Sequence, residues 1–381
     1  MGSRTRTTLR RVHMWLGLGT GLLFVLLGLT GSALVFYQEI DVLLHPRIRV
    51  EAASPAPGWS SPVWDRALAT VRAHWPADAG QWRFEATGAR GPIAARHYPG
   101  GPPGSHMSER MMVWLSPDGS QVLRQDRWGD YAMSWIYELH MDLLSGEMGH
   151  SIVGWSGLLL LLLLFSGLAA WWPRGSWRKA TGFKRGAAPI RRLYDIHKLV
   201  GLSALPLLIL FAVTGFMLAL PTLSDRMLAH VAGPLDIQPV TRSTPRPGAP
   251  VPLAVALAAG HRALPDARLA WIEVPPPGPG VIRLRVQVPG DPSRRFPHSY
   301  IQVDQYSSAV LAVFDARRHG LSTKVNNWLH PLHDASVGGL ATRLLAFVVG
   351  LLPALLFVTG LLRWTQRNRR RPHLLSLKDP V

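Results

Sequence analysis

Four apolar stretches constrain the fold of this 381-residue chain more than any other feature. They run roughly over residues 14–37, 151–172, 199–220 and 337–364. A helix of about 20 residues crosses a hydrocarbon core of about 30 Å, and it satisfies its backbone polar groups internally. We therefore expect a membrane α-helical fold with four transmembrane helices, of which the first is a retained anchor and not a cleaved signal peptide.

The distribution of charge predicts the orientation of these helices. The chain has 41 Lys and Arg against 23 Asp and Glu, a net charge of +18. Nearly all of this excess lies in three short segments beside the apolar stretches, at 1–12, 173–198 and 363–381. This pattern marks cytoplasmic flanks and argues against a nucleic-acid partner. We expect a multi-pass protein of the bacterial inner membrane, surrounded by lipid, with both termini cytoplasmic.

The two segments between spans one and two and between spans three and four are then periplasmic, and each is long enough for a small domain. Each begins with a Pro-rich linker, at Pro46–Pro62 and Pro239–Pro252. An amphipathic helix follows, and then come alternating apolar and polar residues typical of strands. The expected helices are Val63–His74 and Leu253–Leu264, and the expected strand regions are 81–86, 111–123, 267–274, 282–288 and 300–314. Both segments are predicted to be α+β.

The predicted domain organisation has eight parts. They are the N-terminus with helix 1 (1–37), periplasmic domain 1 (38–136), helix 2 (137–173), a basic cytoplasmic loop (174–196), helix 3 (197–220), periplasmic domain 2 (221–329), helix 4 (330–364) and a cytoplasmic tail (365–381).

The two halves of the chain repeat one pattern of His, Gly and Trp. Spans one and three share a His followed at fixed offsets by Gly and by Thr-Gly, namely His13, Gly17, Thr30, Gly31 and His197, Gly201, Thr214, Gly215. Spans two and four share a second template, namely His140, Gly146, Ser166, Gly167, Trp171 and His333, Gly339, Thr359, Gly360, Trp364. We expect two parallel helix–domain–helix repeats, related by a pseudo-two-fold axis along the membrane normal.

This symmetry places four histidines in two facing pairs. His13 and His197 should lie near the cytoplasmic face, and His140 and His333 near the outer face. Facing imidazoles can supply both axial ligands of a b-type haem. The competing interpretation is four interfacial histidines satisfied by water or lipid headgroups. The chain contains no cysteine, so iron–sulfur clusters, thiolate metal sites and covalent haem attachment are excluded.

Three further residues are weaker candidates. His150 and Arg343 occupy equivalent positions of the repeat, ten residues after His140 and His333. They could pair with a haem propionate or an anionic substrate, or could extend their polar ends to the membrane surface. His330 competes with His333 as a ligand. The Ser/Thr-Gly pairs are interpreted as helix-packing residues. An unbroken helix from His333 to Trp364 would span about 46 Å, which is long for one efficient electron transfer between haems at its two ends. Either spans two and four tilt or break near Gly146 and Gly339, or aromatic groups relay the electron.

These motifs together resemble the PepSY-associated transmembrane family over nearly the whole chain. The matching strings start at His13, Leu139, Asp195 and Leu332, and the hairpin Val303–Leu311 resembles the PepSY strand–turn–strand signature. The resemblance implies two periplasmic PepSY-like domains. Because relatives include di-haem siderophore reductases, it also implies two haem b groups bound by His13, His140, His197 and His333.

The leading functional hypothesis is a haem oxidoreductase. It would take electrons from an unidentified donor and reduce a ferric siderophore or another ferric chelate in the periplasm, which releases the iron. The alternative is a non-enzymatic PepSY membrane module that binds or regulates a periplasmic partner. The sequence shows no nucleophile, paired carboxylates or phosphate loop that would favour a hydrolase.

Overall fold

The computed structural model describes residues 3–50, 56–76, 80–99, 110–173 and 175–369. Part of the first Pro-rich linker (51–55), position 174 of the basic loop and most of the C-terminal tail (370–381) lie outside these residues. The chain divides into two compact units. One comprises the described parts of 1–36, 136–221 and 332–381, and the other those of 37–135 and 222–331.

The first unit is built from four long helices, as the apolar stretches predict. They are α1 (Ser3–Val35), α5 (Gly146–Trp171), α7 (Pro189–Ala219) and α11 (Gly339–Arg369). Among the described residues, these are the four helices that are long and apolar enough to cross a membrane. Helices α1 and α7 begin inside the basic segments that precede their apolar stretches, so both start earlier than predicted. The short helix α6 (Trp177–Ala180) lies in the basic loop.

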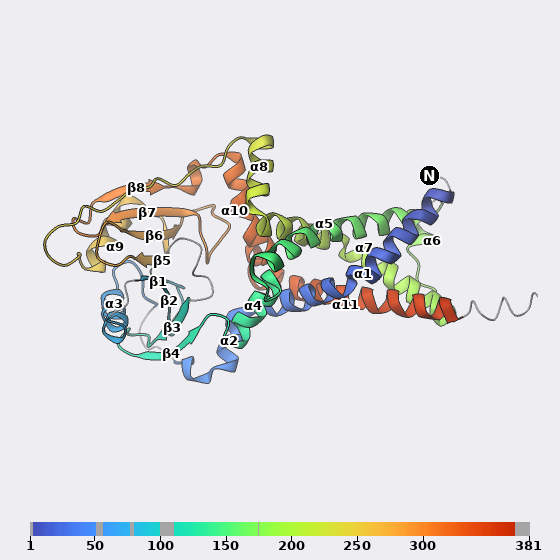
Figure 1. Cartoon of the computed structure of the whole chain (residues 1–381), viewed down its shortest axis with the longest axis horizontal. Coiled ribbons are helices and arrows are strands. Elements are labelled where there is room, and N and C mark those ends of the chain that lie inside the picture. Colours follow the sequence, from blue (N-terminus) through green and yellow to red (C-terminus); the bar gives the residue numbers. More distant parts are fainter. Residues whose placement is uncertain (1–2, 51–55, 77–79, 100–109, 174, 370–381) are drawn as a thin grey trace, which may run out of the picture. The chain divides into compact units, whose positions relative to one another are not determined.

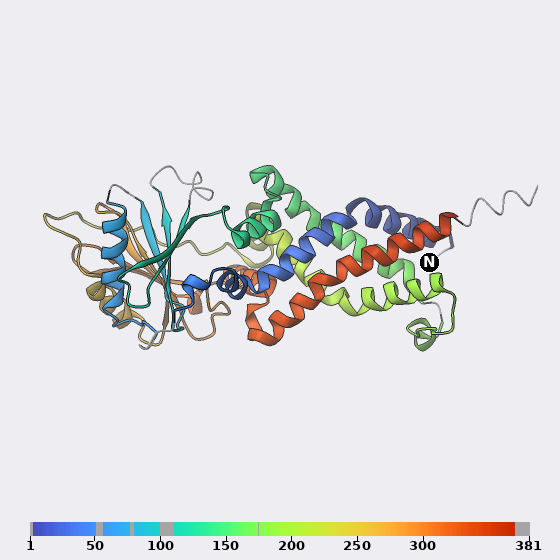
Figure 2. The ribbon, with the colours of Figure 1, turned by 90° about the horizontal axis from the view of Figure 1, so that it is seen from below.

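The four helices pack in a ring in which α1 and α7 each contact both α5 and α11 (Figures 1 and 2). Glycines allow two of these helix pairs to approach closely. A Cβ on Gly350 of α11 would lie 2.8 Å from the carbonyl oxygen of Gly28 in α1, and a Cβ on Gly157 of α5 would lie 2.8 Å from that of Ala212 in α7. Small residues at helix crossings are the usual means of close packing in membranes.

Spans two and four are each broken near Gly146 and Gly339, which is one of the possibilities that the sequence left open. The predicted helix 2 (137–173) consists of the end of α4 (Ala132–Asp142) and all of α5, and the predicted helix 4 (330–364) of the end of α10 (Leu321–His333) and most of α11. A left-handed backbone separates the helices, with positive φ at Leu143, Leu144 and Gly146 in one and at Ala335 and Gly339 in the other. A short 3-10 turn, η3 (Ser336–Gly338), fills the second break.

An aspartate stabilises each of these breaks. The carboxylate of Asp142 accepts a hydrogen bond of 2.9 Å from the backbone N–H of Leu144. The carboxylate of Asp334 accepts one of the same length from the N–H of Ser336. Asp side chains commonly terminate helices by bonding the backbone two residues on.

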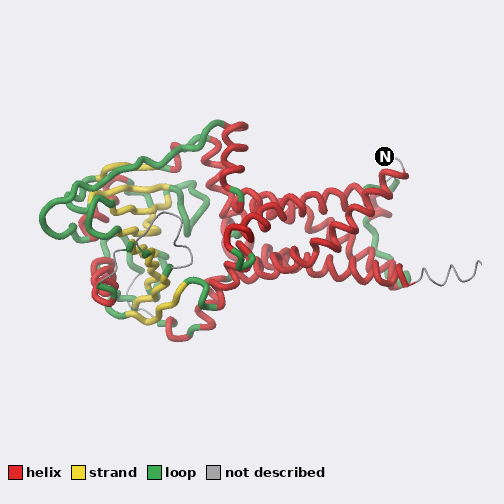
Figure 3. The backbone as a smooth tube through the Cα atoms, in the orientation of Figure 1, coloured by secondary structure: helices red, strands yellow, loops and turns green. Residues whose placement is uncertain are grey.

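The second unit contains one antiparallel sheet of eight strands in the order β4-β3-β2-β1-β5-β6-β7-β8 (Figure 3). Its strands are β1 (Gln81–Glu85), β2 (Ile93–Tyr98), β3 (Met111–Leu115), β4 (Val122–Arg127), β5 (Arg268–Val274), β6 (Val281–Gln287), β7 (Ser299–Asp304) and β8 (Val310–Phe314). Its helical elements are α2 (Tyr37–Leu44), η1 (Pro46–Ile48), α3 (Val63–His74), α8 (Pro221–Ala232), α9 (Leu253–Ala263) and η2 (Ala316–Arg318), with the first turn of α4 and most of α10.

The sheet joins the two segments that the sequence presents as separate domains. Each segment forms a helix and four strands, and β1 pairs with β5 in register, Phe84 opposite Ile272. The helices are also linked, because the carboxylate of Asp65 in α3 accepts hydrogen bonds of 2.6 and 3.0 Å from the N–H groups of Leu253 and Ala254 at the start of α9. Pairing β1 with β5 satisfies two strand edges that two separate domains would expose.

One face of the sheet carries the hydrophobic core of this unit. Helices α3 and α9 pack on it, and its largest fully buried side chains include Trp64, Phe84, Leu257 and Ile301. Sequence reasoning missed β2, whose inward positions include the small residue Ala95, so that its alternation of apolar residues is weak. The predicted helix bounds, in contrast, are confirmed to within one residue.

Candidate functional site

The rings of His13 and His197 face each other in the first unit. His13 lies on α1 and His197 on α7, each in the first third of its helix. Their ring centroids are 6.1 Å apart, and the ring planes are at 84°. The structure therefore brings together the first pair that the sequence predicts.

His140 and His333 form a second facing pair. His140 lies in the last turn of α4, and His333 is the last residue of α10, so both rings stand immediately before the helix breaks. Their centroids are 6.2 Å apart, with the planes at 47°. The ring of Phe211 packs edge-on against His333 at 6.2 Å.

Both distances suit a metal ion shared between two imidazoles. Metal–nitrogen bonds of about 2 Å would place the centroids of two opposed rings about 6 Å apart. Rings in direct van der Waals stacking would be closer, and rings more than 8 Å apart could not share a metal. Each pair thus has the spacing of two axial ligands on one ion.

Hydrogen bonds fix the tautomer of the first pair. Nδ1 of His13 lies 3.0 Å from the carbonyl oxygen of Leu163, and Nδ1 of His197 lies 3.1 Å from that of Leu356. A carbonyl oxygen only accepts, so each Nδ1 carries the proton and donates it. Nε2 then carries the lone pair, and it is the nitrogen able to bind a metal.

The same tautomer follows for the second pair from two threonines. Nδ1 of His140 lies 2.9 Å from the hydroxyl oxygen of Thr30, and Nδ1 of His333 lies 3.0 Å from that of Thr214. Each hydroxyl already donates to a carbonyl one turn earlier in its own helix, at 2.8 Å. The hydroxyl oxygen must therefore accept from the imidazole, so that Nδ1 is again the protonated nitrogen. Thr359 approaches His197 in the same way, at 3.0 Å, and donates to the carbonyl of Leu355.

Each ring also lies against the glycine that follows the Ser or Thr. A Cβ added to Gly167 would lie 2.7 Å from Cε1 of His13, and one added to Gly215 would lie 3.0 Å from the same atom of His333. The corresponding distance is 3.1 Å for Gly31 beside His140 and 3.6 Å for Gly360 beside His197. At three of the four positions a methyl group would occupy space that the imidazole uses.

These contacts correct the interpretation of the Ser/Thr-Gly pairs as packing residues. In each case the hydroxyl lies within hydrogen-bond distance of Nδ1 of a histidine, with Ser166 the most distant at 3.5 Å, and the glycine makes room for that ring. The sequence contained a signal for this role, because the Ser/Thr-Gly pairs recur in both halves of the chain at fixed offsets from the histidines. What the sequence did not show is which pair belongs to which histidine, since partners lie on different helices.

The unbroken helix α1 gives the distance between the two histidine pairs. His140 contacts Thr30, and His13 lies seventeen residues earlier on the same helix. At 1.5 Å per residue, the two levels are about 25 Å apart along α1.

The weaker candidates lie elsewhere. His150, in the second turn of α5, makes no hydrogen bond with any residue that the structure describes. The guanidinium of Arg343 donates bonds of 3.0 and 2.6 Å to the carbonyl oxygen of Val35 at the end of α1 and lies 4.7 Å from the ring of Phe36. Arg343 therefore caps a helix terminus. His330 packs edge-on against Phe296 at 5.5 Å in the second unit.

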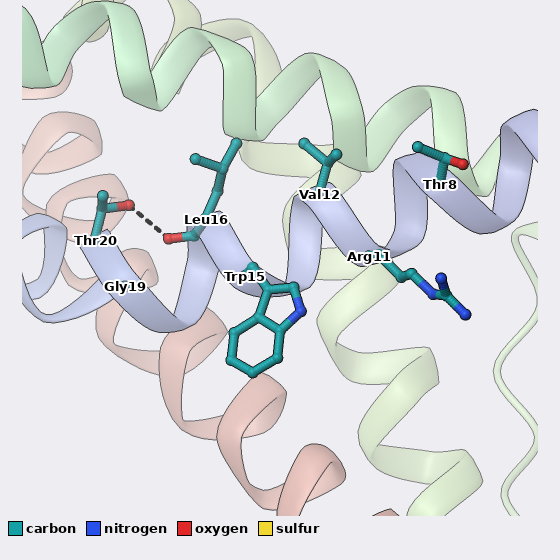
Figure 4. Close-up of a pocket in the computed structure, with 7 residues that line it drawn as sticks. All are labelled: Thr8, Arg11, Val12, Trp15, Leu16, Gly19 and Thr20. Atoms are coloured by element: carbon teal, nitrogen blue, oxygen red, sulfur yellow. Dashed lines mark hydrogen bonds between the residues drawn. The ribbon is translucent and has the colours of Figure 1, made fainter.

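An apolar groove on the outside of α1 is separate from the histidine pairs. Figure 4 shows its lining, which includes Val12, Trp15, Leu16 and Gly19, and no histidine. The side chain of Trp15 is 62% exposed. The groove lies on a helix that is long and apolar enough to cross a membrane, where an exposed apolar surface would contact lipid.

Residues 10–367 match the family described as the PepSY-associated TM region. The chain belongs to this family. The family match includes both histidine pairs and the whole eight-stranded sheet. An uncharacterized protein of Pseudomonas aeruginosa is 30% identical to this PepSY-associated protein over 263 residues. That alignment covers 63% of this chain, which in turn spans 65% of the length of the relative.

Proposed function

We propose that this protein holds two b-type haems, one between each histidine pair, and passes electrons across the bacterial inner membrane to reduce a ferric siderophore in the periplasm. One electron from a donor at the cytoplasmic face would convert each ferric ion to ferrous iron, which the chelate binds more weakly. The observation that carries the proposal is the pair of facing imidazoles, present twice, with the lone pair on Nε2 in each ring.

The number of ligands at each level supports a haem rather than a bare metal ion. Among the residues that the structure describes, no group of three or more His, Asp or Glu could hold a metal. Each level offers two opposed histidines, which is the protein's share in a six-coordinate haem. Haem with two imidazole ligands supplies one-electron transfer at a potential set by its surroundings.

The surroundings of each imidazole have a defined role in this proposal. Donation from Nδ1 to a carbonyl or hydroxyl oxygen holds the ring in one orientation and increases the basicity of Nε2. The glycines keep the ring accessible to a flat macrocycle. The surrounding apolar helices exclude water and thereby restrict the centres to electron transfer.

The same contacts support the duplicated topology. The hydrogen bonds of His13 with α5 correspond to those of His197 with α11, and the bond of His140 to Thr30 corresponds to that of His333 to Thr214. We infer two parallel repeats, related by a pseudo-two-fold axis along the membrane normal. The basic segments favour an orientation with both termini in the cytoplasm and the sheet unit in the periplasm.

The test is an optical spectrum and a pyridine haemochrome count on protein purified from a haem-replete host. We expect a Soret band, two haem b per chain, and reoxidation of the dithionite-reduced protein when a ferric siderophore is added. Protein that binds no haem would overturn the proposal and favour the non-enzymatic membrane module. If the haem is reduced but ferric chelates never reoxidise it, the proposed electron transfer stands and ferric chelates are not the substrate.

A further inference from the structure

The second face of the eight-stranded sheet, opposite the core, is lined by arginine and aromatic side chains. Strand alternation places Arg83 of β1, Arg96 and Tyr98 of β2, and Trp271 of β5 on this face. Arg83 stands directly opposite Arg96 in the register of β1 and β2. Like charges in directly opposed positions destabilise a sheet, so this arrangement needs compensation.

Several arginines of this face have a carboxylate partner. The guanidinium of Arg295 donates bonds of 2.8 and 3.0 Å to the two oxygens of Glu85. Arg283 donates bonds of 2.9 and 2.6 Å to Glu273, which also lies 3.6 Å from Arg83. Arg124 is 2.9 Å from Asp41 and also pairs with Asp126. These pairs lie at the two central strands, β1 and β5, and at the edge strand β4.

Arg96 and Arg110 differ from these, because neither forms an ion pair with a residue that the structure describes. Arg110 is only 5% exposed, and its guanidinium lies 3.7 Å from the ring of Trp128. That of Arg96 lies 4.5 Å from the ring of Trp271. Nε of Arg96 and both Nε and Nη2 of Arg110 are buried without a hydrogen-bond partner. A buried guanidinium with unpaired donors is costly, and an anion would offset that cost.

Tyr98 lies close to these arginines, and its pKa reflects their positive potential. The guanidinium of Arg83 stacks on its ring at 4.2 Å, and that of Arg110 is 5.9 Å away. Burial alone would raise the pKa of Tyr98, yet this pKa is lowered, because Arg96 and Arg110 favour the phenolate. The positive potential at this place therefore outweighs the desolvation of a negative charge.

We propose that Arg96, Arg110 and Tyr98 form a binding site for an anionic ferric chelate whose outer groups are carboxylates. The identity of the metal chelate rests on the proposed function, whereas the preference for an anion rests on the arginines alone. Planar guanidinium forks bind carboxylates through paired, charge-assisted hydrogen bonds, and the unpaired Nε and Nη2 of Arg110 form such a fork. The flanking aromatic rings hold both guanidinium planes in place.

The test measures binding of gallium(III) citrate to the full-length protein in detergent, by calorimetry and by the shift in unfolding temperature. Gallium(III) mimics ferric iron in its chelates but is not reduced, so binding is measured independently of electron transfer. We expect binding to the unaltered protein and a loss of about 10-fold or more in affinity in Arg96→Gln and in Arg110→Gln. The matched control is Arg262→Gln, an exposed arginine of α9, which should bind as the unaltered protein does.

A second measurement separates binding from folding. If Arg96 and Arg110 only held the sheet together, their replacement would lower the unfolding temperature of the ligand-free protein. We expect no such decrease in Arg96→Gln, because Arg96 forms no ion pair with a residue that the structure describes and the substitution removes the cost of burying its charge. If Arg110→Gln does not fold, Arg110→Lys replaces it in the test. This variant keeps the charge but loses the planar guanidinium fork, so it should bind gallium(III) citrate several-fold more weakly.

Three outcomes would overturn the inference. Equal affinity in the unaltered protein and both Gln variants would show that the arginines do not hold the anion. Metal-free citrate binding as tightly as its gallium complex would show a site for organic anions and not for chelates. Absence of binding to a protein that carries two haems and reduces other ferric siderophores would remove this site and leave the proposed function intact.

Discussion

The hydroxyl oxygen of Thr214 accepts a hydrogen bond of 3.0 Å from Nδ1 of His333 while it donates its own proton to the carbonyl of Leu210. This pair of hydrogen bonds fixes the imidazole proton on Nδ1.

Thr214→Val keeps the shape of the side chain and removes the acceptor. We expect haem at the His140–His333 level to be retained about 10- to 100-fold less tightly, with the other level unchanged. The control is Thr20→Val, because Thr20 bonds the carbonyl of Leu16 in the same way without contacting a histidine. Equal haem content in both variants would contradict this role.

Removing one histidine should remove one haem. His140→Ala and His333→Ala should each lower the pyridine haemochrome count from two per chain to one, because one imidazole cannot provide both axial ligands. His150→Ala is the control: its side chain lies on α5 outside both pairs, so that variant should keep both haems. Retention of two low-spin haems in His333→Ala would show that another residue is the ligand.

The glycine beside His13 should be sensitive to a single methyl group. A Cβ on Gly167 would lie 2.7 Å from Cε1 of His13, whereas Gly19 has no atom within 4 Å of the added carbon. Gly167→Ala should displace the ring and reduce the haem content or shift the optical spectrum of the His13–His197 level. Gly19→Ala should do neither, and similar spectra for the two variants would argue against close packing around His13.

Arg343 should contribute to stability and not to haem binding. Its guanidinium bonds the carbonyl of Val35, at the negative end of the α1 dipole. We expect Arg343→Gln to reduce the free energy of unfolding by about 1 to 3 kcal/mol while both haems remain. Thermal unfolding followed by haem absorbance measures both quantities. An unchanged unfolding temperature with slower chelate reduction would instead support the role in anion pairing suggested by the repeat.

Tyr98 should ionise at lower pH than an ordinary tyrosine. Its pKa in the folded protein is lowered by Arg96 and Arg110, against the opposing effect of burial. Across the window from this lowered value to that of the unfolded chain, the unfolded state binds more protons, so stability should rise with pH. Difference absorbance of phenolate between the unaltered protein and Tyr98→Phe gives the titration curve. In Arg96→Gln the curve should move to higher pH, and an unmoved curve would refute the local positive potential.

The histidine pairs show which features of the site could be predicted from the sequence. Offsets between His13, Thr30 and their counterparts in the second half of the chain predicted which imidazoles face each other. They could do so because residues at equal positions in a repeat occupy equal depths. The same offsets did not assign Thr30 to His140, because the two residues lie on different helices and are 110 positions apart.

The second unit shows a similar limit. Local periodicity located α3 and α9 to within one residue, but β2 was missed because Ala95 gives little apolar signal. Nothing in either segment indicated that β1 would pair with β5. Strand pairing over almost 190 residues depends on matching backbone edges, and the sequence of a single strand does not specify its neighbour.

By itself the sequence determined the four spans and the pairing of four histidines, because hydrophobic length and repeat spacing are local properties. Only the tertiary structure decided which hydroxyl orients which imidazole, how the two α+β segments merge into one sheet, and which arginines lack a carboxylate. Those properties depend on side chains from distant parts of the chain that meet only in the folded structure. Burial there makes a missing hydrogen bond or an unpaired charge energetically costly.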